Sequence, residues 1–119
     1  MKIELGQVIA ERQLRDLDRP GVVVSIRLGL PCVFPDEPRN GDHYCPYQIT
    51  GAGDERVRYA GGVDSLQALE LALLVLPSEL KALQKTHPGL RWEDAPEGHF
   101  AFTPTVMSYP PLVSSGQEE

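Results

Sequence analysis

Apolar and polar side chains alternate along four stretches in the first half of the chain, which is the pattern of strands that bury one face. In the clearest stretch, residues 22–30, one face carries Val22, Val24, Ile26 and Leu28. The other stretches are residues 7–14, 44–50 and 55–60. Pro46 lies inside the third and favours an edge position or a bulge, because proline cannot donate a ladder hydrogen bond. The pattern predicts a four-stranded antiparallel meander.

Turn-forming residues connect these strands. The tetrapeptides Asp18-Arg19-Pro20-Gly21 and Gly51-Ala52-Gly53-Asp54 combine residues that favour tight turns, because proline fixes φ and glycine tolerates a positive φ. The longer connection, residues 31–43, is rich in proline. Its prolines exclude a central strand or a helix there.

A long helix is predicted after Gly61-Gly62. Asp64 and Gln67 have the spacing of a capping box, and His87-Pro88-Gly89 ends the segment. Leucines recur at alternating intervals of three and four and form one stripe, which we expect to cover the sheet: Leu66, Leu69, Leu73, Leu76, Leu80 and Leu83. Pro77 removes the bond to the carbonyl of Leu73 and predicts a kink or a restart.

The first part of this helix is apolar on more than one side. Leu71, Leu74 and Val75 lie outside the leucine stripe, and a helix of this kind needs burial on a second side. Either residues 90–113 fold back over it, or a second copy of the protein covers it. The aromatic residues of the C-terminal segment favour the fold-back, because they must themselves pack somewhere. Leu71, Leu74 and Val75 are the candidate interface residues.

These elements define an α+β protein, in which a four-stranded antiparallel β-meander packs on one long helix and an irregular C-terminal segment follows. The chain has 119 residues, which is the size of one domain. We expect that domain to span residues 1–113. Residues 114–119 are predicted to be a disordered tail.

Charge and cysteine content narrow the class of protein. The chain carries 11 Lys and Arg against 17 Asp and Glu, a net charge of −6, which gives no general attraction to nucleic acid or anionic membranes. Its longest apolar run, residues 71–76, is too short to span a bilayer, and its first residues lack the apolar core of a signal peptide. Two cysteines fit a reducing compartment. We therefore predict a cytoplasmic protein without a nucleic-acid or membrane partner.

Three motifs resemble a family of small bacterial proteins described only as a domain of unknown function. They are Ile9-Ala10-Glu11-Arg12, then Cys45-Pro46-Tyr47 with Ile49 and Gly51, and finally Gly62-Val63-Asp64-Ser65-Leu66-Gln67-Ala68-Leu69 with Leu71-Ala72-Leu73. The likeness covers about residues 8–85. It implies a bacterial origin and four strands followed by a helix, and it implies no activity.

Cys32, His43 and Cys45 form the one set with the chemistry of a metal or nucleophile site. Their spacing is not that of a zinc knuckle, and Cys45 is expected to point into the core as a small hydrophobe. No orienting third group or oxyanion device accompanies the cysteine and histidine. We expect no metal, no cofactor and no catalytic residue, although whether the three side chains converge stays open.

Basic residues on the strands are the better candidates for a binding surface. Arg27, Arg56 and Arg58, with Gln48 beside them, are expected on the solvent face of the sheet. One interpretation is a solvated face with cross-strand ion pairs. The other is a polar platform for a protein or an anionic ligand, because the planar guanidinium makes bidentate contacts.

The sequence favours a non-catalytic protein-interaction protein of a bacterial cytoplasm, in the manner of an immunity protein or an antitoxin that blocks a toxin. Its small size, its acidity and the lack of a catalytic constellation all agree with this hypothesis. One alternative is a small-molecule or anion-binding module that uses the sheet face. Another is a small metal- or cysteine-dependent enzyme.

Overall fold

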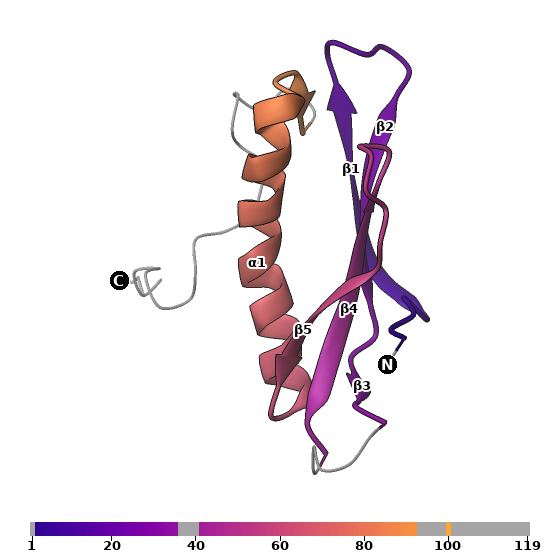
Figure 1. Ribbon diagram of the computed structural model, residues 1–119, viewed down its shortest axis with the longest axis vertical. Helices are drawn as coiled ribbons and strands as arrows, with labels where there is room; N and C mark the ends of the chain where they lie inside the picture. Colours follow the sequence, from indigo (N-terminus) through magenta and orange to yellow (C-terminus); the bar gives the residue numbers. More distant parts are fainter. Residues whose placement is uncertain (1, 36–40, 93–99, 101–119) are drawn as a thin grey trace, which may run out of the picture.

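A single antiparallel sheet with one helix across it makes up the computed structural model, which describes residues 2–35, 41–92 and 100 (Figure 1). Helix α1, Ser65–Thr86, lies along one face of the sheet. The N-terminal segment lies on the other side, where the backbone of Leu5 approaches Gly29 closely. The predicted α+β class, with an antiparallel sheet and one long helix, is confirmed.

The sheet has six strands rather than the predicted four. Four of them form the meander, in which each strand pairs with the next: β1 Val8–Asp16, β2 Val23–Gly29, β4 His43–Thr50 and β5 Arg58–Gly62. The additional strands have two residues each and are β3 Cys32–Val33 and β6 Leu90–Arg91. Strand β3 pairs with β4, and β6 pairs with β1.

Contacts with β4 and β5 account for β3, which lies in the proline-rich connection. Pairing with β4 resumes there after the break that follows Gly29, with Cys32 opposite Tyr44. The next residue, Phe34, is buried, and its ring centroid lies 5.1 Å from that of Tyr44 and 5.7 Å from that of Tyr59. Aromatic pairs at such distances stabilise beyond their buried area. The prolines of this connection limit β3 to two residues, but they do not prevent its pairing with β4.

Strand β5 begins later than predicted. Residues 55–57 belong to the connection between β4 and β5, because Glu55 folds back: its carboxylate accepts the amide of Gly51 at 2.9 Å, and its carbonyl accepts the Gln48 side chain at 2.7 Å. Hydrogen bonds of this local kind compete with strand pairing. At its start, β5 sets Arg58 opposite Tyr47.

The core lies between the sheet and α1. The predicted inward residues of β2, Val24, Ile26 and Leu28, are buried, and so is Cys45 on β4. The buried set includes Leu90 and Phe100 from beyond the helix. Leu90 and Phe100 thus belong to the core between helix and sheet. The predicted cover of the helix by residues 90–113 falls mostly, and the predicted tail at 114–119 entirely, outside the described residues.

Helix α1 buries part of the predicted stripe: Leu76 and Leu80 are buried, Leu69 and Leu83 are partly buried against the core, and Leu66 and Leu73 are exposed. Its buried residues recur every four positions and are Ala68, Ala72, Leu76 and Leu80. Leu66 is 71% exposed and Leu73 is 43% exposed, so their predicted burial was wrong. Alanines let the N-terminal half of the helix approach the sheet closely, where a Cβ on Gly62 would lie only 2.6 Å from the amide of Ala68. The leucine period alone did not reveal this close approach.

The capping residues predicted from the sequence lie at the two ends of α1. Asp64 accepts the amide of Gln67 at 2.8 Å, and Gln67 in turn accepts the amide of Val63 at 2.8 Å. His87 is the C-cap residue. Pro77 lies inside the helix, which runs from Ser65 to Thr86 as one element, so the predicted restart does not occur. Packing of its buried side chains stabilises the helix across the missing hydrogen bond.

Asp16 anchors the turn between β1 and β2 to the segment after the helix. Its buried carboxylate accepts the amide of Asp18 at 3.0 Å and the Nε of Arg19 at 2.8 Å. Burial alone would raise the pKa of Asp16, but these hydrogen bonds and the charges of Arg19 and His87 outweigh it and lower the pKa. A Cβ on Gly89 would lie 2.8 Å from this carboxylate, so glycine is required for the close approach.

Asp16→Asn is expected to lower the free energy of unfolding at pH 7 by roughly 2 kcal/mol, since a buried hydrogen bond to a charged group is lost. The folded-state pKa lies below the unfolded value of about 3.9, so the carboxylate stabilises the fold above that pH. This contribution is lost as the pH falls through the folded pKa. Denaturant unfolding at pH 7 and at acid pH should therefore show the two proteins converge at acid pH. An equal difference at both pH values would contradict this account.

Candidate functional site

The predicted arginine surface is divided between the two faces of the sheet. Arg27 lies on the face away from α1, where its Nε contacts Glu11 at 3.0 Å and Gln48 is its neighbour on β4. Arg58 lies opposite Tyr47, a core residue, and reaches toward the helix. Arg56 lies in the connection between β4 and β5. Arg27 thus forms a solvated ion pair, whereas Arg56 and Arg58 belong to a different place, whose lining also includes Gln48.

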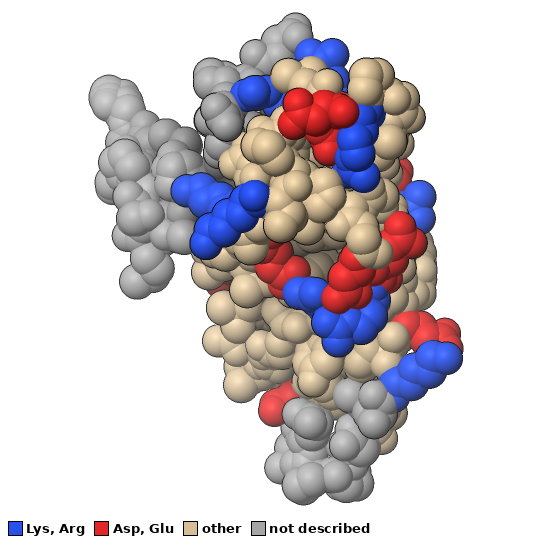
Figure 2. All heavy atoms as spheres, turned by 45° about the horizontal axis from the view of Figure 1, so that its top comes forward, with Lys and Arg blue, Asp and Glu red and all other residues tan. Residues whose placement is uncertain are grey.

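That place is a cleft of about 220 Å³ between α1 and the β4–β5 connection. Apolar side chains lining the cleft are Tyr47, Ile49, Ala82 and Leu83. Its charged residues are Asp54, Arg56, Arg58 and Glu79. Figure 2 shows acidic and basic groups side by side around a hollow on this side of the molecule. The cleft therefore combines apolar walls with both signs of charge.

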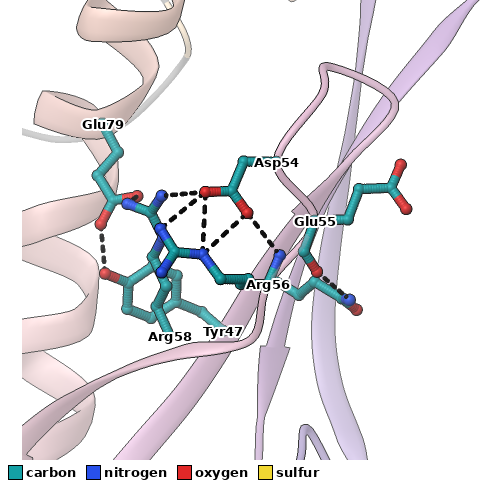
Figure 3. Close-up of polar contacts among 7 residues, drawn as sticks. Tyr47, Asp54, Glu55, Arg56, Arg58 and Glu79 are labelled. Carbon is teal, nitrogen blue, oxygen red and sulfur yellow. Dashed lines mark hydrogen bonds and ion pairs between the residues drawn. The ribbon is translucent and has the colours of Figure 1, made fainter.

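A chain of hydrogen bonds connects the charged residues of the cleft (Figure 3). Arg58 donates from Nη1 to Glu79 at 3.0 Å and from Nη2 to Asp54 at 3.1 Å. Arg56 donates from Nη2 to the same Asp54 oxygen at 2.8 Å. The Tyr47 hydroxyl donates to the second oxygen of Glu79. Two guanidinium groups are thus held next to each other by one shared carboxylate.

The electrostatics follow from this geometry. The side-chain hydrogen bond from Arg56, with that of its backbone amide, lowers the pKa of Asp54, so that this carboxylate is ionised at any physiological pH. Burial, together with the hydrogen bond to the Glu79 carboxylate, raises the pKa of Tyr47. Tyr47 therefore stays protonated and acts as a hydrogen-bond donor to Glu79.

The cysteine and histidine set does not form a metal site. Within residues 2–35, 41–92 and 100, no group of three or more His, Cys, Asp or Glu side chains could hold a metal ion. Cys32 is exposed and lies opposite Tyr44, whereas Cys45 is buried in the core on the other face. Burial, with the nearby charge of Cys32, raises the pKa of Cys45 to about 11, so its thiol is protonated at neutral pH.

The predicted interface residues of α1 are exposed. Leu71, Leu74 and Val75 are each 38% accessible. Their i, i+3, i+4 spacing places them next to one another on the helix. Leu66 and Leu73 are also exposed but lie on another side of the helix. We call Leu71, Leu74 and Val75 the outer face of α1.

Sequence reasoning missed Tyr47, Asp54 and Glu79. It placed Tyr47 in a strand and Asp54 in a turn, and it gave neither side chain a partner. Glu79 is the signal that was available, because it is the only acidic residue of the helix after Glu70. An acidic side chain that faces the sheet favours an ion pair, and Arg58 provides it.

The fold and the cleft define an α+β protein with a polar cleft between its single long helix and an antiparallel sheet. A family model described as a domain of unknown function (DUF6968) matches residues 10–104, so the chain belongs to that family. Neither the curated proteins nor the solved structures gave a match. In the part of the chain that the structure describes, no helix is long and apolar enough to cross a membrane.

Proposed function

We propose that this protein is a non-catalytic binding protein that holds another protein on the outer face of α1. The observation that carries the proposal is the exposure of three neighbouring apolar side chains, Leu71, Leu74 and Val75, on a helix of 22 residues. Apolar side chains exposed together on one element are typical of interaction surfaces. An amphipathic helix or an apolar groove on the partner would bury them in the way that helix-in-groove complexes do.

The charge of the chain favours a basic partner. The net charge of −6 gives an attractive field for a cationic surface and accelerates encounter with it. This combination agrees with an immunity- or antitoxin-like protein of a bacterial cytoplasm that blocks a basic toxin. The raised pKa of Cys45 supports a role without catalysis, because a protonated buried thiol is a poor nucleophile.

The test is co-expression with the product of the neighbouring gene, followed by light scattering of the purified protein. A complex of defined stoichiometry is expected, and Leu74→Glu should abolish it, because the glutamate would be buried without a partner. Val33→Glu is the matched control, since Val33 is 52% exposed on β3 and lies outside α1. That variant should bind like the wild type.

Two outcomes would contradict the proposal. One is a complex that survives Leu74→Glu, which would place the interface elsewhere. The other is a monomer with no complex, which would leave the exposed leucines without a protein partner. A homodimer that Leu74→Glu dissociates would assign the outer face of α1 to a second copy of the chain instead of a toxin.

A further inference from the structure

The cleft between α1 and the β4–β5 connection carries an inference independent of the outer face of α1. Its two arginines keep hydrogen-bonding capacity: Arg56 bonds through Nε and Nη2, and Arg58 through Nη1 and Nη2. Within the described residues, Nη1 of Arg56 and Nε of Arg58 have no hydrogen bond. A guanidinium is a planar fork that matches a carboxylate, so this pair is suited to a planar anion.

The two carboxylates of the cleft differ in their exposure to solvent and in the element that carries them. Glu79 is 23% exposed, lies on α1 and accepts bonds from both Tyr47 and Arg58. Asp54 is 44% exposed, lies in a connection between strands and bonds only to arginines among the described residues. Asp54 accepts more hydrogen bonds than Glu79, but its carboxylate is open to solvent, so an incoming anion can reach the same guanidinium groups and compete with it. Glu79 thus fixes Arg58, and Asp54 is the group that a ligand could replace.

We propose that the cleft binds a small monoanionic ligand whose carboxylate is joined to a flat apolar body. The carboxylate lies between Arg56 and Arg58 in competition with Asp54. The apolar body lies against Ile49, Ala82 and Leu83, which line the same cleft. A cavity of about 220 Å³ accommodates a single small ring system. The Asp54 carboxylate therefore makes the contacts with Arg56 and Arg58 that the carboxylate of the ligand would make.

The charge balance favours a carboxylate over a phosphate. Two arginines face two carboxylates in the cleft, so its charged residues sum to zero. A doubly charged phosphate would be repelled by Glu79 and Asp54 more strongly than a single carboxylate. It would also leave the apolar wall uncovered. The preferred ligand therefore carries one negative charge and one apolar surface.

The test is an NMR titration of the ¹⁵N-labelled protein with benzoate, with benzamide as the neutral analogue of the same shape and inorganic phosphate as the second anion. Benzoate should shift the amide signals of Ile49, Arg58 and Leu83, whereas benzamide and phosphate should not. Arg56→Met should weaken benzoate binding by roughly tenfold, since a hydrogen bond to a charged group is lost. Arg56 is the variant of choice because its side chain is 76% exposed and its loss leaves the core unchanged.

Asp54→Asn gives the discriminating result. It should tighten benzoate binding by about threefold, because an exposed carboxylate no longer competes for the arginines. Its amide oxygen can still accept the backbone amide of Arg56, as the carboxylate does at 3.0 Å, so the connection keeps its shape. Arg27→Met, which breaks the ion pair with Glu11 on the opposite face, is the matched control and should leave binding unchanged.

Several results would overturn the proposal. They are equal shifts with benzamide, tighter binding of phosphate than of benzoate, no response to benzoate at any concentration, or weaker binding in Asp54→Asn than in the wild type. None of them depends on the protein partner of α1. Failure of this site and failure of the proposed function are therefore told apart by separate measurements.

Discussion

Leu76→Ala is expected to lower the free energy of unfolding by about 3 kcal/mol, the typical cost of truncating a fully buried leucine. Leu76 is 1% exposed and lies in the middle of α1, where it packs into the core between helix and sheet. The loss combines the transfer of its methyl groups to water with the cavity left behind. Chemical denaturation followed by circular dichroism measures the change.

The matched control is Leu73→Ala, three residues earlier on the same helix. Leu73 is 43% exposed, so its truncation should cost less than about 1 kcal/mol. Both residues belong to the leucine stripe that the sequence predicts. Equal costs would mean that Leu73 faces the sheet as Leu76 does, and the observed register of α1 would be wrong.

Gly51→Ala is expected to cost about 3 kcal/mol, from a strained backbone and a steric overlap together. Gly51 has a φ of +93°, which side-chain-bearing residues rarely adopt. A Cβ at this position would lie 2.3 Å from the carbonyl oxygen of Val23. Because the obstacle is backbone rather than a flexible side chain, the end of β4 would have to move away from β2. Thermal and denaturant unfolding would both report the loss.

Gly53→Ala separates the two causes. Gly53 has a similar φ of +108°, but a Cβ there would meet no atom within 4 Å. Its substitution should cost only the backbone strain, roughly 1–2 kcal/mol. If the two variants were equally stable, the close approach of Gly51 to Val23 would not contribute.

Much of the fold could be predicted because it rests on local patterns. Three features determine a local conformation that can be predicted directly from the sequence. They are the alternation in β2, the cap at Asp64 and the turn glycines. Strands β3 and β6 could not be predicted in this way, since two-residue strands have no period to detect. Leu90 and Arg91 form a strand only because β1 offers them an edge. Pairing with β4 and with β1, rather than a local pattern, determines β3 and β6.

The candidate site was predictable in residue type and not in placement. Arg56 and Arg58 were recognised as binding candidates, but their partners come from other elements. Glu79 lies on α1 and Asp54 in the β4–β5 connection, and only the packing of helix on sheet brings them together. Arg27 was grouped with the other arginines because alternation along a strand gives a face but does not show which face the helix covers. The same uncertainty explains why Leu66 and Leu73 of the predicted helix stripe are exposed, although its other leucines pack on the core.

Strand β6 also has a consequence for biosynthesis. It pairs Leu90 with Asp16 and Arg91 with Arg15, and the amide of Leu17 donates to the carbonyl of Gly89 at 2.9 Å. A ribosome makes roughly 5–20 residues per second, so β1 leaves it several seconds before β6 exists. Until then that end of β1 lacks its later neighbour, and nascent chains with open strand edges are substrates for chaperones. Translational pausing after α1 would prolong this vulnerable interval, and the arrival of residues 89–91 ends it.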